Sequence, residues 1–146
     1  MAEHSIHLNV DWPGGRNSTG MMTVGNLETE VSIPKKMDGP DIGTNPSDML
    51  LGAAGVCYII TLAAMVERAE LPLKDMGLES EGIVDITDGV ITYKKIIHRP
   101  TVLLQDHATE KDLKKLERLI VQADKSCMIS RAIEGNVEIE LQPTIS

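Results

Sequence analysis

The longest uncharged stretch of the sequence runs from Met49 to Val66 and reads MLLGAAGVCYIITLAAMV. Its 18 residues reach the lower limit for a helix that spans a bilayer. However, two glycines, four alanines and a threonine dilute it, no cluster of Lys or Arg flanks it, and no second such segment exists for it to pair with. We therefore expect no membrane span. We expect instead a helix buried on all sides, in a soluble core or at a subunit interface.

Length and charge narrow the class of protein. A chain of 146 residues fits one domain, which we expect to cover residues 1–146, and its core must be aliphatic because there is no Phe. Fourteen Lys and Arg against 22 Asp and Glu give a net charge of −8, which disfavours binding to nucleic acid or to anionic membranes. Aromatic residues make up only 2%, so the stacking platforms of single-strand binders are missing as well.

The expected compartment is a reducing cytoplasm. Two cysteines cannot form the disulfide framework of a small secreted protein. The segment Met1–His4 has neither the basic region nor the apolar region of an export signal.

The remaining pattern predicts an α+β fold, with antiparallel strands and no alternating βαβ units. Period-two alternation and turn signals mark the strands, and a capping-box-like start with a 3.6-residue apolar period marks an amphipathic helix. The expected elements are a strand at Ser5–Val10, a hairpin around Gly25-Asn26 within Met21–Ile33, a loop at Pro34–Pro46, a hairpin of Leu78–Thr87 and Val90–Gln105 joined at Asp88-Gly89, a helix from Thr109 to Ala123, a short helix from Met128 to Ile133 and a strand at Val137–Leu141.

Several familiar sites are excluded by spacing. The sequence contains no GxGxxG, no GxxxxGK[ST] and no GxSxG. It therefore gives no indication of a nucleotide-binding loop or of a hydrolase nucleophile motif. The four histidines are scattered without cysteines or carboxylates at ligand spacing. We therefore expect neither a cofactor nor a metal.

The two thiols remain as candidates for chemistry. Cys57 is embedded in the apolar stretch, where desolvation alone raises a thiol pKa and where a small buried hydrophobe is an equal alternative. Cys127 lies between Lys125 and Arg131 near the expected start of a short helix, a setting that lowers a thiol pKa and favours reactivity. Sequence spacing leaves open whether the two thiols meet.

Gly14-Gly15-Arg16 is a third candidate feature. A guanidinium that follows two flexible residues can reach into a pocket and hold a thiolate. The alternative is an arginine on an exposed loop.

Taken together, three segments resemble the OsmC/Ohr family of thiol-dependent hydroperoxide reductases, in the right order and over nearly the whole chain. The segments are Trp12-Pro13-Gly14-Gly15-Arg16, the stretch from Gly43-Thr44-Asn45-Pro46 to Cys57, and Ala123-Asp124-Lys125-Ser126-Cys127 followed by Ser130 and Gly135-Asn136-Val137. The resemblance implies an intertwined homodimer with antiparallel sheets around a long apolar central helix. It also implies Cys57 as the peroxidatic cysteine, Cys127 as the resolving cysteine and Arg16 as the partner of the thiolate.

The sequence departs from the family pattern in several places. Family peroxidases usually carry Glu directly after the Asn-Pro pair, to orient the arginine; here that residue is Ser47, and the carboxylate is Asp48. Tyr58 and Met128 follow the two cysteines where Phe and Pro are usual. These differences indicate a divergent OsmC-like member, with Asp48 as the candidate carboxylate.

The expected function is a peroxidase that reduces organic hydroperoxides, and hydrogen peroxide as a further substrate, through a Cys57 sulfenic acid that Cys127 resolves to a disulfide. An external dithiol or lipoyl-type reductant must then reopen the disulfide, because the sequence has no cofactor motif. We expect the α-carbons of the two cysteines within about 7 Å of each other. The alternatives are a non-enzymatic dimer that binds a small apolar or thiol ligand, and another thiol enzyme on the same scaffold.

Overall fold

The computed structural model describes residues 2–146, which form two compact units divided between Met49 and Leu50. The expectation of a single domain over residues 1–146 stays a prediction.

The first unit is built on a three-stranded antiparallel sheet in the order β1 (Leu8–Asp11), β2 (Gly20–Val24) and β3 (Leu27–Val31). Val24 pairs with Leu27 across a two-residue turn in which Gly25 has a φ of 56°, so the expected hairpin at Gly25-Asn26 is observed. The expected loop at Pro34–Pro46 also contains one 3₁₀ turn, η1 (Lys35–Met37).

Helix α1 runs from Pro46 to Arg68 and so begins three residues earlier than the charge-free stretch. Asn45 Oδ1 accepts a hydrogen bond from the Asp48 backbone N–H at 3.0 Å, which satisfies one of the amides that a helix start leaves open. Proline is well tolerated at the first helical position, where its missing N–H is not needed. The start is therefore fixed by capping at Asn45 and Pro46 rather than by the apolar pattern.

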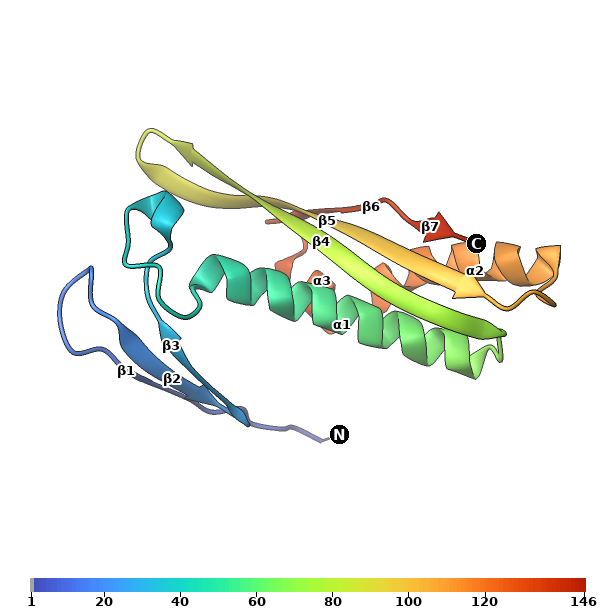
Figure 1. The fold of residues 1–146 in the computed structure, drawn as a ribbon, viewed down its shortest axis with the longest axis horizontal. Helices are drawn as coiled ribbons and strands as arrows, with labels where there is room; N and C mark the ends of the chain where they lie inside the picture. The colour runs from blue at the N-terminus through green and yellow to red at the C-terminus, as the bar shows by residue number, and fades with distance from the viewer. Residues whose placement is uncertain (1) are drawn as a thin grey trace. The chain divides into compact units, whose positions relative to one another are not determined.

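The second unit contains a long antiparallel hairpin of β4 (Leu73–Thr87) and β5 (Val90–Leu104), as Figure 1 shows. Its turn at Asp88-Gly89 has positive φ at both residues, 52° and 76°, as a tight two-residue hairpin turn requires. The hairpin predicted from this dipeptide is confirmed, and β4 begins five residues before the expected strand.

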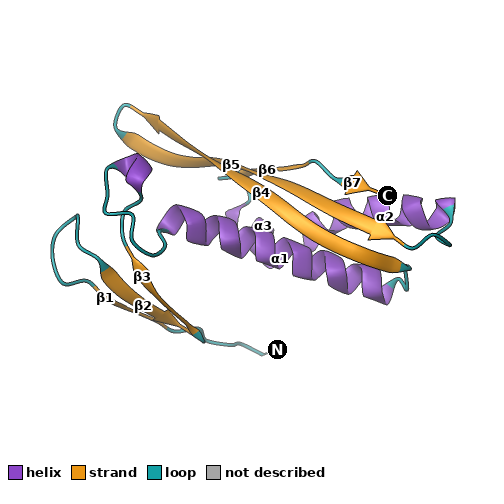
Figure 2. Ribbon diagram, viewed as in Figure 1, coloured by secondary structure: helices purple, strands orange, loops and turns teal. Residues whose placement is uncertain are grey.

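The chain then forms α2 (Glu110–Ser126) and α3 (Met128–Ile133) before it returns to the sheet. Strands β6 (Glu138–Leu141) and β7 (Thr144–Ile145) both pair with β5 in parallel, so the sheet is mixed rather than purely antiparallel. The expected α+β class with no alternating βαβ units is confirmed, although this single parallel crossover was not predicted. Parallel strands need a long crossover, and the two helices between β5 and β6 supply it (Figure 2).

The core of the second unit lies between α1, α2 and the sheet, and it is aliphatic as expected except for one tyrosine. Its buried members are Tyr58, Leu62, Val66, Leu71, Val102, Leu104, Leu116, Ile120 and Ala123. The first three of these fall at helical spacing on one face of α1. That face therefore anchors the helix on the sheet and fixes the direction in which the neighbouring Cys57 points.

The other face of α1 is exposed in this chain. Val56 and Ile60, one helical turn apart, expose 57% and 62% of their surface. The helix is long and apolar enough to cross a membrane by length and composition alone, a test that core helices also pass. Burial on all sides, one of the sequence expectations, is not seen in the single chain, because only one face is covered.

Candidate functional site

Cys57 lies in α1 at the edge of the buried face, where its side chain is half-buried. One turn further along, Thr61 donates a hydrogen bond from its hydroxyl to the Cys57 carbonyl oxygen at 2.7 Å. The Thr61 hydroxyl also lies within hydrogen-bonding range of the Cys57 thiol. Cys57 is therefore accessible from one side and held by polar groups on the other.

Cys127 is fully buried at the single residue that separates α2 from α3. Its extended backbone (φ −61°, ψ 124°) ends α2, and its N–H still donates to the carbonyl of Ala123 at 2.9 Å. Its own carbonyl accepts the N–H of Arg131 at 3.0 Å, so the same residue starts α3. The break between the two helices thus places the thiol at the first turn of α3.

The structure brings the two thiols together. The side chains of Cys57 and Cys127 are in hydrogen-bond contact, and both are free thiols. The backbone N–H groups of Met128 and Ile129 also donate to the Cys57 sulfur. These are first-turn amides of α3, which have no partner inside their own helix and are therefore available to an anion.

This arrangement gives the two thiols opposite acidities. Burial raises the pKa of Cys57, but the donors from Cys127, Ile129, Met128 and Thr61 together outweigh it, and the net pKa is lowered. Burial also raises the pKa of Cys127, and the hydrogen bond to Cys57 raises it further. Cys57 is thus the group that ionises, and Cys127 remains the protonated donor.

Two expectations from the sequence are corrected here. The apolar helix was expected to leave Cys57 without local stabilisation of a thiolate, whereas α3 supplies it. Cys127 was expected to have a lowered pKa because it lies at a helix start near Lys125 and Arg131, whereas its pKa is raised. The reason is that burial and the hydrogen bond to Cys57 outweigh the donors from Ser130 and Ile129 at the start of α3.

Arg16 lies in the first unit, where its guanidinium is bound by main-chain oxygens. It donates to the carbonyl oxygens of Met37 at 2.6 Å and Asp38 at 3.4 Å, and to Asn17 Oδ1 at 2.8 Å. These contacts hold the arginine against the end of η1. Its pairing with the Cys57 thiolate stays a prediction.

Asp48 is part of the start of α1. Its carboxylate accepts a hydrogen bond from Asn45 Nδ2 at 3.0 Å, and its backbone N–H donates back to Asn45 Oδ1. This reciprocal pair differs from a capping box in that the Asp48 carboxylate accepts from the side chain of Asn45 and not from its backbone N–H. It supplies a structural role for Asp48, while its role toward Arg16, and that of Ser47, stay predictions.

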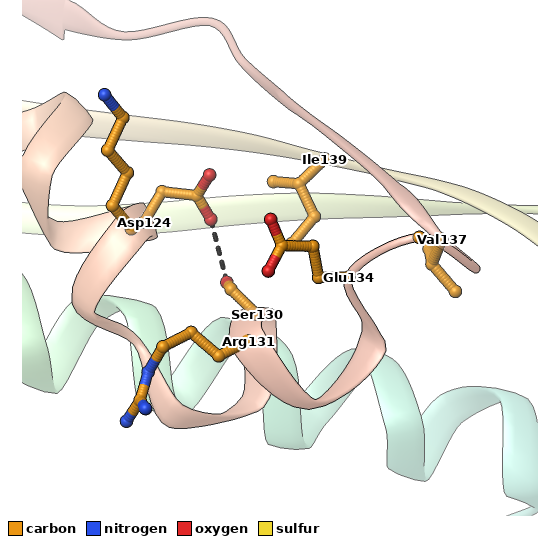
Figure 3. A pocket seen from close by; sticks show the side chains of 8 residues that line it. Asp124, Ser130, Arg131, Glu134, Val137 and Ile139 are labelled. Carbon is orange, nitrogen blue, oxygen red and sulfur yellow. Dashed lines mark hydrogen bonds between the residues drawn. The ribbon is translucent and has the colours of Figure 1, made fainter.

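Sequence reasoning missed a polar cluster beneath the two cysteines. Ser130 donates a hydrogen bond to Asp124 Oδ1 at 2.8 Å across the break between α2 and α3, as Figure 3 shows. Both residues belong to the segment that carried the family resemblance, but neither was assigned a role. Helical periodicity cannot pair residues six positions apart, because the extended residue between the helices resets the register.

His98 on β5 was also missed. It is fully buried, its Nδ1 lies 2.6 Å from Ser80 Oγ, and its Nε2 has no partner among the described residues. Burial lowers the pKa of His98, against an opposing effect of Asp124. The strand pattern marks position 98 as inward-facing but does not indicate which polar groups surround it.

A pocket of about 230 Å³ opens beside Asp124 and Ser130. Figure 3 shows Asp124 and Ser130 pointing toward each other at the pocket and Arg131 turned away from them. The lining residues are Asp124, Lys125, Ser130, Arg131, Glu134, Gly135, Val137 and Ile139. Among residues 2–146, no group of three or more His, Cys, Asp or Glu is placed to hold a metal ion.

Comparison with known proteins identifies relatives over the full length. Residues 39–142 match the family model described as OsmC-like protein. The chain is 57% identical to the uncharacterized protein YmaD of Bacillus subtilis (strain 168) over 145 residues, which cover 99% of this chain and 97% of that protein.

Solved structures share the fold. An organic hydroperoxide resistance protein from Elizabethkingia anophelis matches with a TM-score of 0.79 at 21% identity, covering 99% of each chain. An organic hydroperoxide resistance protein OsmC from Legionella pneumophila matches with a TM-score of 0.78 at 21% identity, again covering 99% of each chain. An OsmC-like protein of unknown function from Vibrio cholerae matches with a TM-score of 0.78 at 15% identity, covering 96% of this chain and 100% of its own. The α+β fold expected from the family resemblance is confirmed.

Proposed function

Because the chain belongs to the family of OsmC-like proteins, we propose that it is a thiol-dependent peroxidase that reduces organic hydroperoxides through Cys57. The observation that carries the proposal is the contact between Cys57 and Cys127, in which one thiol ionises and the other stays protonated. A nucleophilic thiolate beside a second thiol is what a two-cysteine peroxidase needs. The organic hydroperoxide resistance proteins that share the fold favour the same assignment.

The reaction proceeds in three balanced steps. The Cys57 thiolate attacks the distal peroxide oxygen, the O–O bond breaks, and the alkoxide takes a proton to leave as an alcohol, so that Cys57 becomes a sulfenic acid. Cys127 then attacks the Cys57 sulfur, forming the disulfide and releasing water. An external dithiol, such as a lipoyl-type reductant, returns both cysteines to thiols and is itself oxidised to a disulfide.

The surroundings of Cys57 favour an alkyl hydroperoxide as substrate. Val56 and Ile60 flank it on α1 and are exposed, and Met128, whose N–H donates to the Cys57 sulfur, is 61% exposed. An alkyl chain gains roughly 0.8 kcal/mol for each methylene that it buries against such side chains. Hydrogen peroxide gains nothing from them.

The first unit supplies the remaining proposed residues. Arg16 is the cation proposed to hold the Cys57 thiolate, because its guanidinium presents several donors in one plane. Asp48 is the carboxylate proposed to orient Arg16. The exposed apolar face of α1 supports a homodimer in which this face is covered, and we expect the dimer in the cytoplasm.

The test is peroxide consumption with excess dithiothreitol, measured with cumene hydroperoxide and with hydrogen peroxide. The wild type should consume the organic peroxide faster than hydrogen peroxide, and Cys57→Ser should consume neither. A non-enzymatic binding protein, the alternative function, consumes no peroxide in any form. That result would contradict the peroxidase proposal and favour the binding function.

A further inference from the structure

This inference rests on the proposed function and concerns the step in which Cys127 attacks oxidised Cys57. In the reduced protein the Cys127 thiol donates its proton toward the Cys57 sulfur. Once Cys57 carries oxygen, its sulfur is no longer an anion, and Cys127 must lose its proton to become a nucleophile. Burial opposes that ionisation. A nearby acceptor is therefore needed.

Ser130 provides an oxygen in contact with the Cys127 sulfur. Its hydroxyl and its backbone N–H both lie within hydrogen-bonding range of that sulfur, and the residue is only 7% exposed. The hydroxyl proton of Ser130 is directed to Asp124 Oδ1 at 2.8 Å. A hydroxyl has one proton and two lone pairs, so Ser130 is left as an acceptor toward the thiol.

We propose that Ser130 and Asp124 form a proton relay that activates Cys127 for attack on oxidised Cys57. Ser130 touches the reacting sulfur and is a catalytic residue. Asp124 acts through Ser130 and is a positioning residue. The pocket beside Asp124 and Ser130 connects the end of the relay to water.

The Cys127 proton passes to the Ser130 oxygen while the original Ser130 proton passes to the Asp124 carboxylate. An electron pair of Cys127 forms the S–S bond, the S–O bond of the sulfenic acid breaks, and hydroxide leaves and takes a proton to become water. Asp124 returns its proton to solvent, so the net products are one disulfide and one water molecule. Between transfer and attack, the Ser130 hydroxyl donates to the thiolate, and this hydrogen bond lowers the pKa of Cys127.

Other ionisable groups lie around the relay, and a substitution of Asp124 alone leaves these residues in place. They are Cys57 and Tyr58 on α1, His98 on β5, Lys125 on α2, and Arg131 and Glu134 beside the pocket. Asp124→Asn preserves the shape of the side chain and removes its negative charge. Its amide can donate to Ser130, which turns the serine proton toward Cys127 and removes the acceptor.

The test uses dithiobis-nitrobenzoate, an aromatic disulfide, so that no peroxide is involved. The more acidic and accessible Cys57 attacks the reagent and releases one thionitrobenzoate. Cys127 then attacks the resulting mixed disulfide and releases the second. We expect the first phase to be unchanged in Asp124→Asn, which also shows that the variant is folded, and the second phase to slow by about tenfold or more.

The pH profile separates a relay from a merely structural role. The second phase of the wild type should vary little across neutral pH, because the relay takes up the Cys127 proton inside the protein. In Asp124→Asn and Ser130→Ala it should rise about tenfold per pH unit, following ionisation of the bare thiol. Asp124→Glu should recover part of the rate, and the control Glu117→Gln, an exposed carboxylate on the same helix, should match the wild type.

A second phase in Asp124→Asn with the wild-type rate, or a slower one with the wild-type pH profile, overturns the relay. Neither result bears on whether the protein reduces peroxides. Conversely, the wild type could consume no peroxide and still show a second phase that depends on Asp124. That result would support the relay and contradict the peroxidase function.

Discussion

The imidazole of His98 stacks on the ring of Tyr58 with the ring centroids 4.9 Å apart and the planes 10° from parallel. The Tyr58 hydroxyl donates to the Ile120 carbonyl oxygen at 2.9 Å, so the stack ties α1 to β5 and to α2. Because Tyr58 directly follows Cys57, this buried contact fixes the part of α1 that carries the thiol. The stack is therefore part of the site as well as of the core.

Acid should destabilise the fold through His98. Burial lowers its pKa, so the folded protein keeps the imidazole neutral while the unfolded chain binds a proton below about pH 6.5. The stability that this group contributes is fully present above that pH and is lost as the pH falls toward the folded-state pKa. The loss amounts to about 1.4 kcal/mol for each unit by which the two pKa values differ.

Urea unfolding at several pH values measures this effect. The free energy of unfolding should decrease below the ordinary histidine pKa in the wild type and in the control His107→Gln, which removes an exposed histidine. It should decrease less in His98→Gln. Equal pH dependence in all three proteins would mean that His98 does not carry the effect.

Removal of Cys127 should make Cys57 less acidic. Cys127→Ala deletes a hydrogen-bond donor to the Cys57 sulfur but leaves the backbone donors of Met128 and Ile129 in place. The pH profile of Cys57 alkylation should therefore shift to higher pH. An unshifted profile would show that the thiol contact does not stabilise the Cys57 thiolate.

Arg16 should matter for turnover if it reaches the thiolate. Arg16→Ala is expected to raise the Cys57 pKa and to slow peroxide turnover by about tenfold or more at neutral pH. Arg16→Lys should restore only part of the rate, since a point charge lacks the planar donor set. Asp48→Asn separates the roles of that residue, because an unchanged turnover rate would leave it as a helix-start residue only. Full activity and an unchanged Cys57 pKa in Arg16→Ala would exclude Arg16 from the site.

The exposed face of α1 should hold two chains together. Ile60→Asp places a charge on this apolar face, and sedimentation velocity at micromolar concentration should show monomers where the wild type sediments as a dimer. Ile60→Leu, which keeps the face apolar, should behave as the wild type does. A folded monomeric wild type would contradict the dimer.

The sequence was most informative where local chemistry decides the structure. Asp88-Gly89 and the capping residues Thr109 and Asp112 each predicted a turn or a helix start that the structure contains. The parallel pairing of β6 with β5 could not be predicted, because it depends on where a distant segment returns to the sheet. The opposite acidities of the two thiols were also out of reach, because the lowered pKa of Cys57 depends on a thiol and on amides of α3 that lie 70 to 72 positions later in the sequence.

The most direct test of the account is the redox state of both cysteines after exposure to one equivalent of an organic hydroperoxide. Mass spectrometry of the intact wild type should show the loss of two hydrogens. Thiol titration should detect no free thiol, where the reduced protein has two. The same treatment of Cys127→Ser should leave a Cys57 sulfenic acid that a dimedone-type reagent traps. Two free thiols that persist in the wild type would contradict the assignment of Cys57 and Cys127 as a peroxidatic and resolving pair.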